Sequence, residues 1–167
     1  ARAKAVLDAT ELYVNVNFRM DSSAEYADYV LPATSHYEAW DLRGEVGYHR
    51  YANLTMPPPG LKPIGEAKSE WEICRLLAEK IQETAKRRGV GPIVDPEFTV
   101  ERQGRKEPVT RDLDILLDEF TLLGRVNTDQ DVVKWLIENV PAFQPWTFED
   151  VVRNGYLTLN TNAGLTS

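Results

Sequence analysis

One stretch near the N-terminus constrains the fold of this chain more than any other. From Leu12 to Phe18, β-branched and aromatic residues alternate with asparagine, which is typical of a β-strand. Asp21 or Ser22 can cap a short helix that follows, because either side chain accepts a hydrogen bond from a free backbone N–H. A second, buried strand is expected over residues 29–31. It stops at Pro32, whose nitrogen carries no hydrogen for a ladder. Together these elements make half of an α/β nucleotide-binding layout.

The clearest helix is expected over residues 70–88. Ser69 and Glu72 form a capping box before it, and Gly89 supplies a C-terminal stop. Apolar residues recur at helical spacing, so we expect one face to pack on the sheet that holds the two strands. Cys74 lies on that face and is interpreted as an inert core residue. The stripe consists of Trp71, Cys74, Leu77, Ile81 and Ala85.

Shorter elements are expected elsewhere in the chain. Residues 1–9 favour a helix, residues 33–65 an extended crossing segment, and residues 90–109 a surface loop with room for one hairpin around residues 103–104. A strand is expected over residues 156–159. Three short helices begin at threonine caps, namely Thr110, Thr128 and Thr147, and end at Gly124, before Pro141 and at Gly155.

These elements predict an α/β fold: a Rossmann-like parallel sheet with flanking helices, part of a dinucleotide-binding domain, followed by a C-terminal run of short helices. Residues 1–90 are expected to form the α/β dinucleotide-binding part. Residues 91–167 are expected to form a loop and short-helix extension of the same domain.

Charge and cysteine content exclude several classes of protein. The 167 residues hold 19 lysines and arginines against 26 aspartates and glutamates, a net charge of −7, so nucleic acid is not an expected partner. No apolar run approaches the roughly 20 residues needed to cross a bilayer, and no direct membrane span is expected. Cys74 is the single cysteine, which excludes a four-thiolate iron–sulfur site, and His36 and His49 lie in no metal-ligand pattern. The start at Ala1 suggests a fragment.

The turn from Asn17 to Ser23 is the feature of functional interest. The chain has no GxSxG elbow, P-loop or GxGxxG fingerprint. Open α/β sheets bind nucleotides where the carboxyl end of a strand meets a helix N-terminus, and this turn has that place. From the residues alone, two interpretations stay open: Asp21 and Ser22 merely cap a helix, or the turn binds a nucleotide.

Three separated motifs carry a resemblance to a known family. The run from Asn17 to Pro32 ends in Ala-Asp-Tyr-Val-Leu-Pro, and Glu38 stands six residues beyond Pro32. In this order the motifs resemble the dimethyl sulfoxide reductase family of molybdenum enzymes. Phe-Arg-Met at 18–20, the pair Tyr37-Glu38 and the run Glu-Ala-Lys-Ser-Glu-Trp-Glu-Ile at 66–73 resemble its nitrate reductase-like branch, which acts on nitrate, selenate, chlorate or perchlorate, dimethyl sulfide and ethylbenzene. The resemblance covers Leu12 to about Lys80 well and is thin beyond Val90.

The resemblance implies a large α/β subunit that holds molybdenum through two molybdopterin guanine dinucleotides. This chain would be a fragment of one of two related dinucleotide-binding domains, inactive alone, within a parent that catalyses oxyanion reduction or anaerobic dehydrogenation. Its implied partners are the remainder of the large subunit and an iron–sulfur electron-transfer subunit. An iron–sulfur cluster and the protein ligand to molybdenum would lie elsewhere in the parent.

The same resemblance implies roles for the residues of the turn. Asn17 would touch a guanine or ribose edge, because an amide both donates and accepts hydrogen bonds. Side chains and free N–H groups of the turn would meet the pyrophosphate. Many family members carry serine or threonine at position 21, so Asp21, an anion that repels phosphate, departs from the pattern. Residues 36–38 would border a substrate funnel or hold the structure by hydrogen bonds. The implied cofactor-binding residues are Asn17, Arg19, Asp21, Ser22 and Ser23.

Two other functions compete with this one. The first is a non-catalytic α/β module that binds a nucleotide or a protein partner, and cysteines at iron–sulfur spacing upstream would argue against it. The second is a nicotinamide-dependent Rossmann dehydrogenase, which the missing glycine fingerprint after the first strand disfavours.

Overall fold

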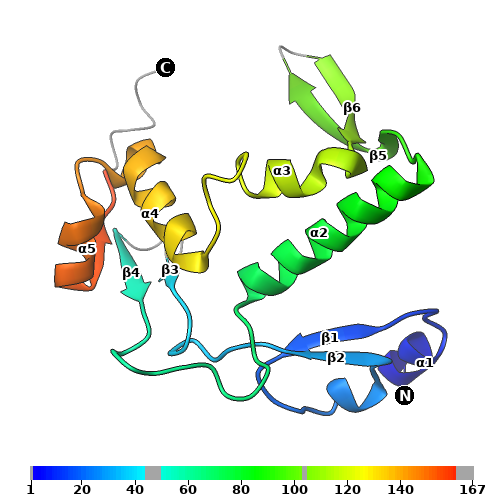
Figure 1. Ribbon diagram of the computed structural model, residues 1–167, viewed down its shortest axis with the longest axis horizontal. Coiled ribbons are helices and arrows are strands. Elements are labelled where there is room, and N and C mark those ends of the chain that lie inside the picture. The colour runs from blue at the N-terminus through cyan, green and yellow to red at the C-terminus, as the bar shows by residue number, and fades with distance from the viewer. Residues whose placement is uncertain (1, 44–49, 103–104, 161–167) are drawn as a thin grey trace. The chain divides into compact units, whose positions relative to one another are not determined.

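The computed structural model describes residues 2–43, 50–102 and 105–160 (Figure 1). The chain divides into two compact units. One unit comprises Ala1–Ile73 with Thr128–Ser167, and the other comprises Cys74–Asn127. This division rests on packing and does not follow the predicted boundary at residue 90, so the assignment of residues 1–90 to a dinucleotide-binding part stays a prediction.

The first unit begins with the predicted strand, turn and strand. Helix α1 (Arg2–Asp8) precedes strand β1 (Val14–Asn17), and the 3-10 helix η1 (Ala24–Tyr26) leads into strand β2 (Tyr29–Pro32). The two strands pair in parallel, with Val14 opposite Tyr29 and Asn17 opposite Pro32. Both strands and the short helix are therefore confirmed. The expectation that the second strand is buried is wrong, because Tyr29 is 64% exposed and Val30 and Leu31 are only half-buried.

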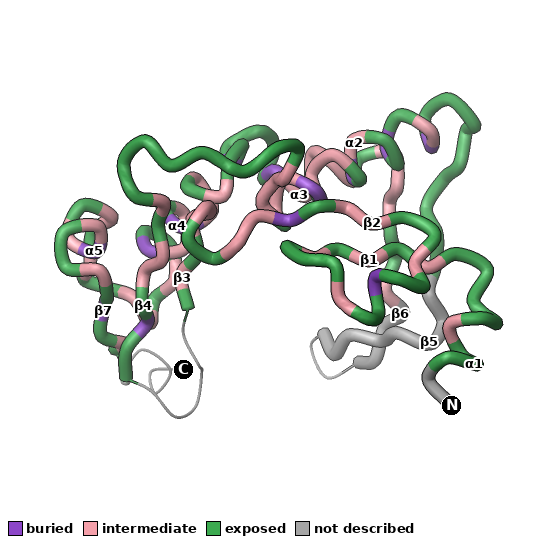
Figure 2. The backbone as a smooth tube through the Cα atoms, turned by 90° about the horizontal axis from the view of Figure 1, so that it is seen from below, coloured by how far each residue is buried: buried purple, intermediate pink, exposed green. Residues whose placement is uncertain are grey.

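An antiparallel sheet forms the core of the same unit. Strand β4 (Tyr51–Thr55) pairs with β3 (Asp41–Arg43) on one side and with β7 (Tyr156–Thr158) on the other. Helices α4 (Asp129–Asn139) and α5 (Phe148–Asn154) pack on it, with the short helix η3 (Pro141–Phe143) between them. Buried residues gather on these elements (Figure 2). The core cluster consists of Ala52, Val133, Ile137, Val151 and Leu157.

Local signals set the ends of these helices as predicted. The hydroxyl of Thr128 accepts a hydrogen bond from the Asp131 N–H at 3.1 Å, and the Asp131 carboxylate accepts the Thr128 N–H at 3.0 Å, which completes a capping box. The Thr147 hydroxyl caps α5, and Gly155 ends it with a φ of 79°. The expected extended segment over residues 33–65 missed β3 and β4, because their apolar residues do not alternate strictly enough to predict strands.

The second unit holds most of the long helix and a hairpin. Helix α2 (Glu70–Arg88) begins and ends where the capping residues predicted, and the hydroxyl of Ser69 accepts the Glu72 N–H at 3.2 Å. Strands β5 (Ile93–Arg102) and β6 (Arg105–Arg111) pair antiparallel, so the hairpin expected in this segment is confirmed, but it takes up most of the residues that were expected to form a loop. Its expected turn, residues 103–104, lies outside the described residues. The helices η2 (Leu113–Ile115) and α3 (Leu116–Phe120) follow. Thr110 lies in β6 and is not a cap.

The buried face of α2 differs from the predicted stripe. Cys74 is exposed, and Leu77 and Ile81 are 49% and 42% exposed, so the interpretation of Cys74 as a core residue is wrong. Within the second unit, Ala85 is buried as predicted, and the other buried residues of the helix are Ala78 and Gln82. The carbonyl oxygen of the Gln82 side chain accepts the Leu117 N–H at 2.7 Å and thereby caps α3. A polar residue takes a core position because it satisfies an N–H that the short helix leaves unpaired.

The described fold mixes helices and strands, and its parallel sheet has two strands. A Rossmann-like sheet remains a prediction, because such a sheet needs more parallel strands than this pair. Within the described residues, none of the helices is both long enough and apolar enough to traverse a bilayer.

Candidate functional site

Asp21 organises the turn that follows β1. One oxygen of its carboxylate accepts the N–H groups of Ser23 and Ala24 at 3.0 and 2.9 Å. The other accepts the side-chain amide of Asn17 at 2.9 Å. Asp21 therefore caps η1, as one of the two interpretations of this turn predicted, and also holds the Asn17 side chain in place.

The charge of Asp21 is stabilised by these bonds. The Ala24 N–H lowers the pKa of the Asp21 carboxyl most, and the Ser23 N–H, the Asn17 amide and the Arg19 guanidinium lower it further, while desolvation opposes them. The resemblance implied that free N–H groups of this turn would meet the pyrophosphate. The N–H groups of Ser23 and Ala24 are not free, because the Asp21 carboxylate accepts both.

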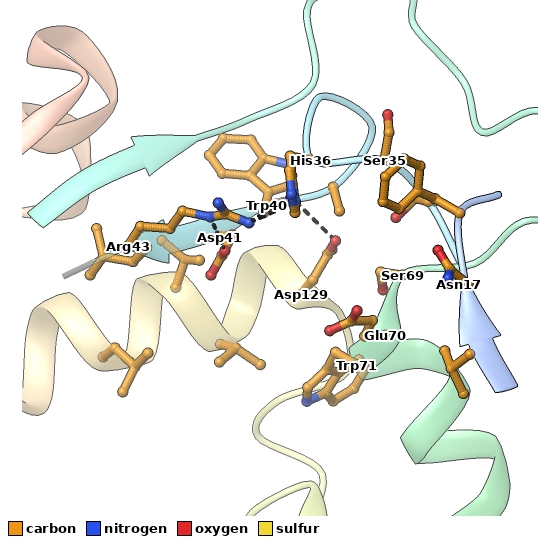
Figure 3. Close-up of a pocket in the computed structure, with 18 residues that line it drawn as sticks. Asn17, Ser35, His36, Trp40, Asp41, Arg43, Ser69, Glu70, Trp71 and Asp129 are labelled. Carbon is orange, nitrogen blue, oxygen red and sulfur yellow. Dashed lines mark hydrogen bonds and ion pairs between the residues drawn. The ribbon is translucent and has the colours of Figure 1, made fainter. Parts of the chain in front are cut away.

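A pocket of about 440 Å³ opens where β1 and β2 end (Figure 3). All of its walls belong to the first unit. They come from the end of β1, the loop after β2, strand β3, the first turn of α2 and the first turns of α4. The polar and aromatic lining residues are Asn17, Phe18, Thr34, Ser35, His36, Trp40, Asp41, Arg43, Ser69, Glu70, Trp71 and Asp129.

Arg43 is the guanidinium of this pocket, and two neighbours orient it. Its Nε donates to the Asp41 carboxylate at 3.0 Å, and its Nη2 lies 2.6 Å from His36 Nδ1. A guanidinium only donates, so the His36 nitrogen that faces it is the acceptor and carries no hydrogen. The His36 ring also lies 6.2 Å from the Phe18 ring, centroid to centroid, which links the loop after β2 to the end of β1.

Glu38 and Asp129 hold the walls together. The Glu38 carboxylate accepts the N–H and the hydroxyl of Ser35 at 2.8 and 2.7 Å, and the N–H of Ile64 at 3.2 Å. The two bonds from Ser35 lower the pKa of the Glu38 carboxyl, and the Ile64 N–H adds to them against desolvation. Asp129 accepts the backbone N–H of Trp40 at 3.0 Å across 89 residues of sequence. The sequence left two roles open for Glu38, at the border of a substrate funnel or in holding the structure by hydrogen bonds, and these bonds support the second.

Comparison with known proteins places the chain in a family. A family model described as molybdopterin oxidoreductase matches residues 1–80. The alpha subunit of dimethylsulfide dehydrogenase from Rhodovulum sulfidophilum is 44% identical over 99% of this chain and 17% of its own length. The alpha subunit of chlorate reductase from Ideonella dechloratans is 40% identical over 96% of this chain and 16% of its own length. The chain belongs to the molybdopterin oxidoreductases.

The similarity reaches further than the motifs predicted. The respiratory nitrate reductase alpha subunit of Haloferax mediterranei is 50% identical over 53% of this chain and 9% of its own length. The alignment with the dimethylsulfide dehydrogenase subunit nevertheless spans 165 residues, so the resemblance is not thin beyond Val90 for every relative. The chain spans about a sixth of the length of the first two relatives.

Within this chain, the predicted site residues separate into two groups. Asn17 lines the pocket, whereas Arg19, Asp21, Ser22 and Ser23 are absent from its described lining. Ser22 and Ser23 are exposed, and the guanidinium carbon of Arg19 lies 5.4 Å from the centre of the Phe18 ring. The structure thus joins Asn17 to Asp21 by a hydrogen bond but does not gather all five side chains around one cavity.

The sequence assigned no site role to most residues of the pocket, among them Arg43, Glu70, Trp71 and Asp129. Three of these four had a local signal, because they stand in the first turns of helices whose caps, Ser69 and Thr128, are visible in the sequence. Arg43 had none, since it lies on a strand that the sequence did not predict.

One hydrogen-bond acceptor of the pocket is available to the organic part of a molybdenum cofactor. The Asn17 amide nitrogen is used by Asp21, but the amide oxygen accepts only the Arg19 N–H at a long 3.4 Å, so it can accept from a base or a ribose hydroxyl. Among the described residues, no group of three or more histidine, cysteine, aspartate or glutamate side chains is arranged to hold a metal ion. The pocket therefore offers a hydrogen-bond acceptor to the organic part of a cofactor, while the described part of the chain gives molybdenum no ligand set.

Proposed function

We propose that this chain is part of the large subunit of a molybdenum-dependent oxidoreductase and helps to bind one molybdopterin guanine dinucleotide. The observation that carries the proposal is the position of Asn17. It stands at the carboxyl end of a parallel strand and lines a polar pocket there, which is where open α/β sheets bind nucleotides. The family to which the chain belongs supports the same cofactor class.

In this proposal the residues of the turn have different tasks. Asn17 contacts the guanosine end through its amide oxygen, and Asp21 is a positioning residue that fixes the amide. Arg19, Ser22 and Ser23 lie on the exposed side of the turn, where their side chains would face the pyrophosphate. Asp21 stays an anion, with its two oxygens accepting three N–H donors, so the phosphates would lie away from its carboxylate.

When bound, the molybdenum cofactor supplies the oxygen-atom transfer or hydroxylation chemistry, while this chain binds and orients it. The names of the relatives indicate two reaction classes for the parent, oxyanion reduction as in chlorate, perchlorate and nitrate reductases and dehydrogenation as in dimethylsulfide dehydrogenase. The chain alone would be inactive. The proposal also includes an iron–sulfur cluster elsewhere in the parent enzyme and an iron–sulfur electron-transfer subunit as its partner.

The exposed apolar residues of this chain support the proposal that its partner is the remainder of the large subunit. Val14 and Val16 of β1 are 40% and 42% exposed, and Tyr29 of β2 is 64% exposed. Strands of a parallel sheet are normally covered on both faces, so this pair requires further covering elements. A chain that spans about a sixth of its relatives has such elements available in the rest of the subunit.

Replacing Asn17 by Ala in the full large subunit tests the proposal. The change removes the hydrogen bond that the amide oxygen would accept from the cofactor and the bond that the amide donates to Asp21, which together cost roughly 1 to 3 kcal/mol of cofactor binding. We expect less molybdenum and less guanine nucleotide per subunit, measured by elemental analysis and by chromatography of the released nucleotide, with an unchanged melting profile. Ser22→Ala should act in the same direction more weakly. The control is Asn154→Ala, an exposed asparagine outside the pocket. Unchanged occupancy in Asn17→Ala would leave the turn as a capped helix without a ligand.

A further inference from the structure

Helix α2 buries small side chains and exposes large ones. Within the second unit its buried residues, Ala78, Gln82 and Ala85, lie on one side of the helix, where Gln82 accepts an N–H of α3. Leu77 and Ile81 stand four residues apart on another stripe of the same helix, and both are exposed. Helices of soluble proteins normally turn their large apolar side chains toward the core. The outward stripe of α2 is therefore suited to burial against another segment.

The second unit has little core of its own. Among its described residues, the buried ones are Ala78, Gln82, Ala85, Thr121 and Val126. Only Val126 among them is apolar and larger than alanine. The core cluster of the described residues lies entirely in the first unit. Because burial of large apolar side chains is the main favourable term in folding, the second unit gains stability from apolar contacts made from outside it.

A groove of about 370 Å³ lies along the outward stripe of α2, and all of its walls belong to the second unit. Its apolar lining residues are Leu77, Ile81 and Ala85 on the helix and Val90 and Leu113 on the segments that follow. The lining on α2 extends over residues 77–88, about three helical turns or roughly 16 Å. An apolar groove of this length fits the apolar face of an amphipathic helix.

Arg88 gives one end of the groove a positive charge. It lines the groove in the last turn of α2, and it has no ion pair among the described residues. Lys80, the other cation of the lining, is already paired with Glu83 at 2.7 Å. A helix laid antiparallel to α2 would bring its first turn beside Arg88, and acidic residues are favoured in the first turn of a helix. The groove is therefore complementary in charge to an antiparallel helix with an acidic start.

The rest of the large subunit can supply such a helix, because the chain spans only about a sixth of the length of the first two relatives. We propose that this groove is the docking site of an amphipathic helix from the remainder of the large subunit. The helix runs antiparallel to α2, with apolar residues on Leu77 and Ile81 and an acidic residue beside Arg88. The inference rests on the proposed function, in which this chain is part of a larger subunit, but concerns a surface that shares no residue with the pocket of Asn17.

Zero-length cross-linking in the full large subunit identifies what occupies the groove. Arg88→Lys keeps the charge and supplies an amine that a carbodiimide joins to a carboxylate in contact with it. We expect peptide mass spectrometry to find position 88 joined to an aspartate or glutamate outside these 167 residues, in a segment with apolar residues at helical spacing. The product should keep the mass of one subunit. Arg87→Lys is the matched control, because Arg87 stands in the same turn but does not line the groove, and it should give at least tenfold less of this product.

Several results of the cross-linking would overturn the inference. They are no cross-link at position 88, equal yields from positions 87 and 88, a partner within the 167 residues, a product with the mass of two large subunits, and a product that contains the electron-transfer subunit. The last two would assign the groove to a second copy or to a separate protein.

A second measurement uses two exposed leucines of the second unit, of which only Leu77 lines the groove. In the full large subunit, Leu77→Asp should speed thermolysin cleavage within residues 74–127 tenfold or more, because a lost docking contact opens the unit locally. Leu123→Asp should change this rate less than twofold, and equal rates would overturn the inference.

The proposed function fails in a different measurement. Full guanine nucleotide content in Asn17→Ala, together with the expected cross-link in Arg88→Lys, would overturn the cofactor role of the turn and support the docking site. Reduced content in Asn17→Ala without a cross-link in Arg88→Lys would support the cofactor role and overturn the docking site.

Discussion

The parallel pair β1–β2 and the antiparallel sheet β3–β4–β7 belong to one unit but bury opposite kinds of side chain. In β1 the asparagines at positions 15 and 17 are half-buried, and Val14 and Val16 are 40% and 42% exposed. In the antiparallel sheet, Ala52 and Leu157 are 1% and 0% exposed. The parallel pair therefore turns its polar side chains inward, while the antiparallel sheet buries apolar side chains.

The two regions differ in how they contribute to stability. The antiparallel sheet has helices α4 and α5 over its apolar face. In the parallel pair, Asn17 lines the pocket, and the Asn15 amide oxygen is buried without a hydrogen-bond partner among the described residues. A buried polar atom without a hydrogen bond lowers the stability of the fold, so such atoms are rare in structural cores and are more typical of binding sites.

The largest effect is expected in the antiparallel region. Ile137 is fully buried between α4 and the sheet, so Ile137→Ala should lower the free energy of unfolding by about 2 to 5 kcal/mol, through lost burial and a residual cavity. Urea melts followed by circular dichroism measure the change. Ile64→Ala is the control, because Ile64 is 81% exposed and its removal should stay within about 0.5 kcal/mol. Similar losses at both positions would contradict the position of the core.

A capping residue of the same region should have a smaller effect. Thr128→Ala removes the hydroxyl that accepts the Asp131 N–H and opens the capping box of α4, which should cost about 1 kcal/mol. Thr128→Ser keeps the hydroxyl and should melt close to the unaltered chain. If serine and alanine destabilise equally, the methyl group and not the cap stabilises this helix.

Removing an apolar side chain from the parallel pair should change the free energy of unfolding little. Val16→Ala is expected to cost less than about 1 kcal/mol because its side chain is 42% exposed, whereas Val151→Ala, at 0% exposure, should cost more than Val16→Ala in the same urea melts. In the full large subunit, the two variants should differ less in their free energy of unfolding if other segments cover β1. A Val16→Ala cost equal to that of Val151→Ala in the short chain would remove the contrast between the regions.

The sequence predicted those parts of the fold that a few neighbouring residues determine. Helix ends at Ser69, Thr128, Thr147 and Gly155 appeared where caps were expected, because a cap satisfies backbone groups three residues away or fewer. The parallel strands followed from β-branched residues in short runs. Thr110 was misinterpreted, since a threonine fits a strand as well as a cap.

Contacts over long separations were not predictable in this way. Strand β7 joins β4 about a hundred residues later, and nothing in residues 51–55 identifies its partner. Gln82 accepts an N–H of a helix 35 residues away, and it is buried with Ala78 on α2, whereas the predicted Cys74 is exposed. For the candidate site, the sequence showed that Asn17 ends a strand. That Asn17 lines the same pocket as Arg43 and Glu70 depends on how the elements pack.

The smallest effect, and the one that probes the turn itself, concerns the charge of Asp21. Hydrogen bonds from Ala24, Ser23 and Asn17 lower the pKa of its carboxyl in the folded chain below the ordinary value of about 3.9. A lowered folded pKa means that the carboxylate stabilises the fold above the unfolded value and that this contribution is lost as the pH falls through the folded pKa. The stability difference between the unaltered chain and Asp21→Asn should therefore be constant from pH 7 to about pH 5 and shrink below that. Carbon-13 NMR of the carboxyl gives its pKa directly, and paired melts give the difference, which cancels the similar acid response of Asp150. A carboxyl that titrates at or above the ordinary value, or a difference that does not change with pH, would show that Asp21 does not organise the turn through its charge.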